Sequence, residues 1–173
     1  MLNIVLFEPE IPQNTGNIMR TCVGIDAVLH LIKPLGFSLQ DKYLRRSGLD
    51  YLDKLKYIVY DDYNDFKAKN SGDFFFLTRY GKKCYSDINY KNYSENIYLV
   101  FGKESTGIDK KILGENIDNC YRIPTSSNVR SLNLSNCVAI CAFEYLRQFD
   151  FFDLSKFEPD SKKGKDFLDQ FKD

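Results

Sequence analysis

The side chains most able to do chemistry in this sequence lie in three short polar loops. Residues 122–136 are the most informative, because they start as a predicted strand, break at Pro124 and lead into the most apolar helix of the chain. A polar loop between a strand and a buried helix is a common ligand site in α/β proteins, so this loop, with Ser131 and Asn133, predicts one wall of a pocket. The other two loops are residues 14–20, which end in Arg20, and residues 102–107, which contain Glu104.

The loop 102–107 has the Gly-x4-Gly spacing of a nucleotide-binding P-loop but lacks its chemistry. Ile108 and Asp109 stand where a P-loop needs Lys and Ser or Thr, so nucleoside triphosphate binding is rejected. No GxGxxG follows the first predicted strand, which argues against a nicotinamide dinucleotide site. One interpretation is a simple tight turn. The other is a ligand-contacting loop, because it follows a buried strand and places Glu104 between two glycines that let backbone approach a ligand.

Arg20 is unusual because its neighbours in the predicted helix are apolar. These neighbours are Ile18, Met19, Cys22 and Val23. A guanidinium in such a position either reaches solvent along its own apolar stem or points into a polar site. The sequence leaves both possibilities open.

Catalysis by a histidine base has little support. His30 is the only histidine, and it lies inside the apolar predicted strand 28–32, which favours a packed role. Hydrolases and transferases that depend on a histidine base are therefore not favoured. Ser131 has no His or Lys nearby in the sequence that could activate it, so the simpler interpretation of Ser131 is a helix N-cap.

Basic residues occur mostly in pairs that are typical of solvated faces. Arg45 and Arg46, followed by Gly48 and Tyr51, are the best candidates for contact with phosphate. An arginine fork fits phosphate, and tyrosine can stack on a base. Arg130, beside Ser131, adds a basic residue to the third loop.

Strands and helices alternate along the chain, and several strands are apolar throughout. This pattern predicts an α/β domain with a six-stranded, mostly parallel sheet and helices on both faces. The predicted strands are residues 2–7, 28–32, 57–60, 74–78, 97–101 and 120–123. The predicted helices are one after residues 14–17 and those at 41–46, 63–69, 109–113 and 132–149, while residues 82–96 are predicted to form a loop.

The composition is typical of a globular protein with one core. The chain has 173 residues, of which 43% are hydrophobic, and we expect one domain over residues 1–152. Residues 153–173 read as a charged tail that contains Lys162, Lys163 and Lys165. The formal net charge is zero, so any nucleic-acid site must be a local patch.

The cysteines and the N-terminus predict a cytoplasmic protein. Five cysteines without a CxxC pair argue for reduced, mostly buried thiols and against a metal site. Residues 1–7 have no basic stretch, and no apolar run approaches the length of a membrane span. Neither a signal peptide nor a membrane segment is therefore expected.

Taken together, the three loops resemble the signature motifs of the SPOUT class of RNA methyltransferases. They read Asn14-x-Gly16-x3-Arg20, then Phe101-Gly102-x-Glu104-x2-Gly107, then Ile123-Pro124-x6-Ser131-Leu132-Asn133-x-Ser135. The resemblance is closer still to the small YibK/TrmL-like tRNA 2′-O-methyltransferases, which residues 2–6, 8–12, 34–37 and 44–51 also match. It covers roughly residues 1–150, and the order and spacing of the motifs make it specific.

The resemblance implies a deep trefoil knot near the C-terminal end of the domain. Its three loops would hold S-adenosylmethionine (SAM) in a bent shape, and the sulfonium of SAM needs no metal to be reactive. The positions implied in cofactor contact are Leu77, Gly102, Glu104, Ile123, Ser131 and Leu132.

The resemblance also implies a homodimer with the active site at the interface, in which Arg20 of one subunit reaches the methyl donor of the other. The implied substrate is the ribose 2′-hydroxyl of the wobble pyrimidine, cytidine or 5-substituted uridine, in the anticodon stem-loop of tRNA. The implied catalytic residues are Arg20, Ser131 and Asn133, and the implied RNA contacts are Arg45, Arg46 and Arg130. Arg20 would act as a base, a phosphate clamp or a stabiliser of the alkoxide.

Two alternatives accompany this expectation. The first is the same reaction on ribosomal RNA, against which the lack of an added RNA-binding domain argues. The second is a non-catalytic RNA-binding module that keeps the fold. The intact motif residues argue against it, namely Arg20, Glu104, Ser131 and Asn133. The third motif departs from its relatives, which tend to carry Met and an acidic residue in the loop, and Phe143 stands where some carry Tyr. These departures concern the choice of substrate rather than the class.

Overall fold

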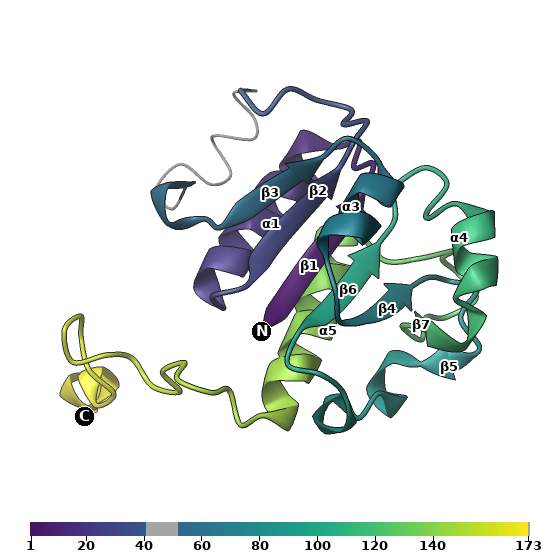
Figure 1. Ribbon diagram of the computed structural model, residues 1–173. Coiled ribbons are helices and arrows are strands. Elements are labelled where there is room, and N and C mark those ends of the chain that lie inside the picture. The colour runs from purple at the N-terminus through teal and green to yellow at the C-terminus, as the bar shows by residue number, and fades with distance from the viewer. Residues whose placement is uncertain (41–51, 173) are drawn as a thin grey trace.

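The computed structural model describes residues 1–40 and 52–172, and its centre is a seven-stranded sheet (Figure 1). The strands follow the order β3-β2-β1-β6-β4-β7-β5, and all neighbouring pairs are parallel. The prediction of a mostly parallel sheet is therefore confirmed. In chain order the strands are β1 (Leu2–Phe7), β2 (Val28–Ile32), β3 (Tyr57–Tyr60), β4 (Asp73–Leu77), β5 (Lys83–Cys84), β6 (Ile97–Phe101) and β7 (Cys120–Arg122).

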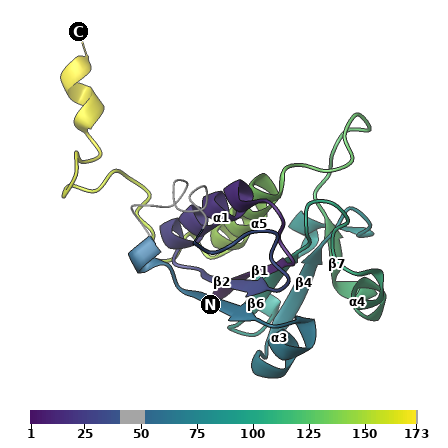
Figure 2. The ribbon, with the colours of Figure 1, turned by 90° about the horizontal axis from the view of Figure 1, so that it is seen from above.

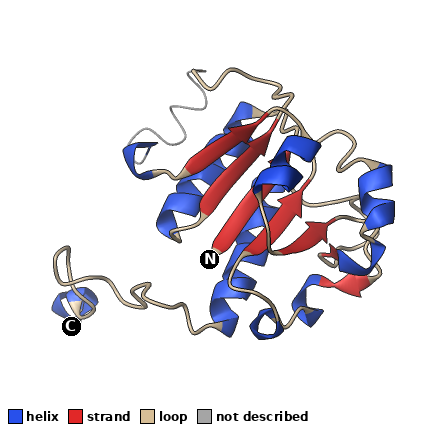
Figure 3. Ribbon diagram, in the orientation of Figure 1, coloured by secondary structure: helices blue, strands red, loops and turns tan. Residues whose placement is uncertain are grey.

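Helices cover both faces of the sheet (Figure 3). Helices α1 and α5 lie side by side on one face, and α3 and α4 pack on the other (Figure 2). The α-helices of the described part are α1 (Pro12–Gly24), α3 (Tyr63–Lys69), α4 (Lys110–Glu115) and α5 (Leu134–Gln148). Its short 3-10 helices are η1 (Leu52–Lys54), η2 (Tyr85–Asp87), η3 (Tyr90–Asn92), η4 (Ile117–Asn119) and η5 (Phe167–Phe171). The predicted helix at residues 41–46 lies outside the described residues.

The central strands β1 and β6 are buried along their whole length because each face of the sheet has its own core. Alternate residues of a strand point to opposite faces, so Leu6 joins α1 and α5 in one core while Val5 joins α3 and α4 in the other. Leu6 is paired with Phe101 in the parallel register. The carboxyl ends of β1 and β6 therefore meet at one edge, together with the loops that follow them.

The sheet has one strand more than the sequence predicted. The extra strand is β5, which pairs with β7 within residues 82–96, a segment that we expected to be a loop. The same segment buries Ile88 and Tyr90, and the Tyr90 ring packs edge-to-face on Phe75 with centroids 5.4 Å apart. A two-residue strand and short 3-10 turns leave no periodicity in the sequence, which is why the pattern missed them.

The chain leaves the sheet after α5. Asp150, Phe151 and Phe152 all have positive φ, and the Phe151 amide donates to the Leu146 carbonyl at 2.8 Å, so a left-handed turn ends the helix. Residues 153–172 then extend away from the sheet (Figures 1 and 2). The whole segment 153–173 carries five lysines and six carboxylates, so it has no excess of positive charge. In the described part of the chain, no helix has the length and apolar character needed to cross a membrane.

Candidate active site

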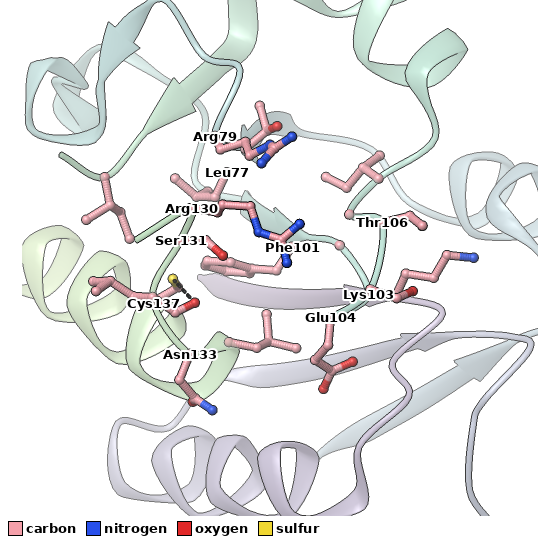
Figure 4. A pocket seen from close by; sticks show the side chains of 18 of the residues that line it. Leu77, Arg79, Phe101, Lys103, Glu104, Thr106, Arg130, Ser131, Asn133 and Cys137 are labelled. Carbon is pink, nitrogen blue, oxygen red and sulfur yellow. Dashed lines mark hydrogen bonds between the residues drawn. The ribbon is translucent and has the colours of Figure 1, made fainter. Parts of the chain in front are cut away.

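A cavity of about 700 Å³ opens at the carboxyl ends of β4, β6 and β7 (Figure 4). Its walls come from the segments at and after the ends of these strands, residues 77–80, 101–110 and 122–137. The start of α1 adds Asn14 and the N-cap Ile11. This edge is where parallel sheets bind ligands. The volume falls within the range of small-molecule sites.

The cavity brings together most of the residues predicted from the sequence. Those that line it are Leu77, Gly102, Glu104, Ile123, Arg130, Ser131, Leu132 and Asn133. Arg20 is not among the lining residues; its side chain is exposed on α1. It lies six residues beyond Asn14, which is roughly 9 Å of helix rise. Arg45 and Arg46 lie outside the described residues.

The two glycines of the loop 102–107 are required by the loop itself. A Cβ on Gly102 would lie 2.3 Å from the Gly107 carbonyl carbon and from the Ile108 nitrogen. Lys103 and Gly107 form an antiparallel bridge, and Gly107 has a φ of +76°, which glycine adopts readily. The glycines therefore close the loop on itself, which is the tight turn that the sequence offered as one interpretation, and both also line the cavity.

Glu104 holds the start of α1. Its carboxylate accepts hydrogen bonds from the Glu10 amide at 2.9 Å, the Ile11 amide at 3.3 Å and the Asn14 side-chain amide at 2.9 Å. The first N–H groups of a helix have no partner within the helix, and the helix dipole favours negative charge there. Glu104 thus fastens the loop after β6 to the helix after β1.

Asn133 extends this network to α5. Its side-chain amide donates to Asn14 Oδ1 at 2.9 Å, and its Oδ1 accepts from the Ser135 amide at 2.9 Å and the Asn136 amide at 3.4 Å. Asn133 is therefore the N-cap of α5, a role that the sequence had offered for Ser131. Through Asn14, all three polar loops are connected by hydrogen bonds.

A cationic rim lies on one side of the cavity. It consists of Arg79, Lys110, Arg122 and Arg130, all with exposed side chains. Figure 4 shows Arg79 and Arg130 above Glu104 and Asn133. In the part of the chain that the structure describes, none of the four forms an ion pair. The rim therefore favours an anionic ligand or substrate.

Arg79, its neighbour Tyr80, Lys110 and Arg122 were not predicted as site residues. The signal that could have identified the first two is their position, because they directly follow a buried apolar strand. The Arg79 guanidinium donates to the Tyr80 hydroxyl at 2.8 Å. This hydrogen bond, with the charges of Arg79 and Lys110, holds the pKa of Tyr80 below its ordinary value.

The histidine is packed as the sequence suggested, whereas the thiol of Cys137, which we expected in the core, is only partly buried. His30 is buried, and burial lowers its pKa to about 4. Cys137 lines the cavity, its thiol lies 3.7 Å from the Leu132 carbonyl as a donor (Figure 4), and burial raises its pKa. Within the described ranges, no three His, Cys, Asp or Glu side chains gather in a way that could hold a metal ion.

Known proteins share this architecture and much of the sequence. The chain is 52% identical over 150 residues, 86% of this chain and 89% of the relative, to a Listeria innocua protein named as a proposed tRNA (cytidine(34)-2′-O)-methyltransferase. A solved structure from work on the 2-OH methylation of C/U34 on tRNA superimposes with a TM-score of 0.80 at 36% identity, covering 87% of this chain and 97% of that one.

A third comparison concerns the fold alone. The SpoU methyltransferase AviRb from Streptomyces viridochromogenes, solved with its cofactor AdoMet, has a TM-score of 0.75 at 19% identity and covers 87% of this chain and 61% of its own. The sequence also matches the SpoU rRNA Methylase family over residues 1–143. The resemblance drawn from the three loops is thereby confirmed, and the chain belongs to the SpoU methylase family.

Proposed function

We propose that this chain methylates the ribose 2′-hydroxyl of the wobble nucleotide, position 34, of tRNA, with SAM as the methyl donor. The base would be cytidine or a 5-substituted uridine. The observation that carries the proposal is the cavity at the carboxyl edge of the sheet, which is built from the three loops that match the SPOUT motifs. The names of relatives matched over most of their length support the tRNA substrate. A tRNA substrate also supports a cytoplasmic location.

The residues of the cavity fit SAM. Leu77, Ile123 and Leu132 offer apolar contacts for an adenine ring, and the surrounding loops offer backbone donors and acceptors. When bound, SAM would supply a methyl group already activated by its sulfonium. The chain then has to hold the ribose hydroxyl in line with that methyl group, exclude water and stabilise the charge that develops on the attacking oxygen.

Ser131 and Asn133 take different parts in this proposal. Ser131 is exposed and lines the cavity, so its hydroxyl is available to orient the ribose or the cofactor. Asn133 uses both ends of its amide on Asn14 and on the first amides of α5. We therefore assign Asn133 a positioning role, in which it holds the third loop against α1.

Arg20 is proposed to act across a homodimer interface. Gln13, Asn17 and Arg20 are exposed at helical spacing on α1, and Phe143 is 48% exposed on the adjacent α5. A partner subunit seated on these helices would receive Arg20 at its own cavity. Because a guanidinium stays protonated in proteins, Arg20 would stabilise the alkoxide or hold a phosphate rather than remove a proton.

The path of the chain supports the proposed trefoil knot. Strand β7 lies beyond β4 on one side of the sheet, whereas α5, the next long element, packs on α1 behind the centre of the sheet. Residues 123–133 connect them past the loop 102–107, and both segments line the cavity.

The proposed RNA contacts are three arginines. Arg130 lines the cavity and would meet RNA there, and Arg45 and Arg46 remain RNA contacts proposed from the sequence.

Calorimetry with SAM and nucleoside analysis of tRNA test the proposal. We expect saturable, one-site binding of SAM. We also expect the 2′-O-methyl mark at position 34 to disappear from the tRNA of a deletion strain and to return with the gene. An absence of SAM binding would contradict the methyltransferase assignment. An unchanged position 34, with a mark lost from ribosomal RNA, would overturn the tRNA substrate.

A further inference from the structure

The tight turn after β4 presents an arginine and a tyrosine in fixed positions. The Thr78 amide donates to the Tyr121 carbonyl at 2.9 Å, and the Gly81 amide donates back to the Thr78 carbonyl at 3.2 Å. A Cβ on Gly81 would lie 2.5 Å from the Tyr121 carbonyl carbon, so the turn is pressed onto β7. Arg79 and Tyr80 occupy its two central positions and are held by backbone contacts on both sides.

Tyr80 is a large aromatic residue, yet its ring is exposed at the cavity wall. Its exposed fraction is 53%, and two cations lie over its ring. The Arg79 guanidinium carbon lies 4.7 Å and the Lys110 nitrogen 4.8 Å from the ring centroid. The guanidinium of Arg122 donates to the Arg79 carbonyl at 3.3 Å and to Thr125 Oγ1 at 3.3 Å. We call Arg79, Tyr80, Lys110 and Arg122 the Tyr80 rim. It shares three residues with the cationic rim and has Tyr80 in place of Arg130.

An exposed aromatic ring beside cations that form no ion pair within residues 1–40 and 52–172 matches the chemistry of single-stranded RNA. Bases stack on exposed aromatic rings, and phosphates pair with arginine and lysine. Lys110 is fixed by donating to the Thr106 and Ile108 carbonyls, each at 3.2 Å, so it adds charge beside the ring without having to be ordered on binding. The rim also borders the cavity where the target ribose is proposed to sit.

We infer that the Tyr80 rim binds a nucleotide next to the methylated one, with its base stacked on Tyr80 and its phosphate held by Arg79 and Arg122. This inference rests on the proposed function, because it takes the cavity to be the SAM and ribose site. It makes Tyr80 a positioning residue: the rim fixes the neighbouring nucleotide, and the target ribose follows through the RNA backbone. A nucleotide seated on this cationic wall of the cavity would also give a chain without net charge a local grip on its substrate.

The test compares Tyr80→Ala, Tyr80→Phe and Arg79→Ala with the wild-type protein, using an in vitro transcribed tRNA. Tyr80→Ala should raise KM for tRNA by about 5- to 100-fold, the range expected for loss of one base stack. Tyr80→Phe keeps the ring and should stay within about threefold of wild type. Arg79→Ala should lower the slope of log KM against log salt concentration by about one. The SAM dissociation constant should not change in any of them.

Lys82→Ala is the matched control, because Lys82 is exposed beside the same turn and does not line the cavity. It should change neither KM for tRNA nor the affinity for SAM. If Tyr80→Ala leaves KM for tRNA within twofold of wild type, the inference is wrong. A parallel loss of SAM affinity would also overturn it and assign the rim to the cofactor. Failure of the wild-type protein to methylate tRNA would instead contradict the proposed function itself.

Discussion

At the scale of single residues, the site is held together by groups that are already engaged with the protein. Glu104 lines the cavity, yet its carboxylate accepts three hydrogen bonds from the start of α1. Asn133 likewise joins Asn14 to the N-terminus of α5. Both were predicted to contact cofactor or substrate, and their geometry favours a different task. They fix the loops whose backbone and apolar side chains would form the SAM site.

Glu104→Gln should therefore affect folding before it affects binding. A glutamine presents one oxygen and an NH2 group to three donors, so at least one partly buried donor loses its acceptor. We expect the free energy of unfolding, measured with urea, to fall by about 1–3 kcal/mol. The control Glu158→Gln, in the exposed tail, should leave the urea midpoint unchanged. A normal midpoint together with weaker SAM binding would make Glu104 a direct cofactor ligand.

At the scale of elements, one buried histidine joins several strands. The His30 ring on β2 contacts Asn3 Oδ1 on β1 through Nε2 at 3.0 Å and the Tyr60 hydroxyl on β3 through Nδ1 at 2.9 Å. The Asn3 amide nitrogen already donates to the Ile97 carbonyl. The Asn3 side-chain oxygen therefore accepts the hydrogen bond from His30 Nε2. It follows that Nε2 carries the proton in the neutral ring and Nδ1 accepts from the Tyr60 hydroxyl. Packing against Phe66 and Tyr98 completes the enclosure.

This histidine should make stability depend on pH in a defined window. Burial lowers its pKa from 6.5 to about 4 in the folded state, so between these values the unfolded chain binds a proton that the folded chain does not. The contribution of this pKa difference to the free energy of unfolding is complete above pH 6.5 and is lost as the pH falls toward 4. Between pH 7 and pH 5 the free energy of unfolding should fall by roughly 2 kcal/mol.

Urea unfolding at both pH values measures this loss, and His30→Gln supplies the control. Glutamine keeps a donor and an acceptor but does not titrate, so the variant should be less stable at pH 7 and lose much less on acidification. Because His30 is the only histidine, no other side chain has an ordinary pKa in the middle of this window. Equal losses in the two proteins would mean that His30 is already charged in the folded state.

The elements that the sequence predicted are those whose pattern is local. Strands β1, β2 and β6 have the predicted bounds, because a parallel strand buried on both faces reads as a continuous apolar run. Strand β5 has only two residues and depends on pairing with β7. In the site, motif spacing located the three loops. It could not reveal the contact of Glu104 with the Glu10 amide, which joins residues 94 positions apart.

At the scale of the whole molecule, the position of Arg20 favours the proposed homodimer, in which a second subunit supplies the arginine to the site. The cavity is lined by residues that follow β4, β6 and β7, together with the start of α1. Arg20 lies further along α1, exposed and outside that lining. An arginine that serves the reaction from there would reach the cavity of a partner seated on α1 and α5. Two variants that are each inactive should therefore complement one another.

Mixing Arg20→Ala with Leu132→Arg tests this arrangement, since Leu132 lines the cavity and an arginine there would block it. Each variant alone should be inactive on tRNA. After subunit exchange, half of the dimers pair the two variants, and each has one site with an open cavity and a partner Arg20, so about a quarter of wild-type activity should return. If Arg20 served its own subunit, every site in the mixed dimer would lack either Arg20 or an open cavity. The mixture would then stay inactive, while sedimentation still detected the mixed dimer.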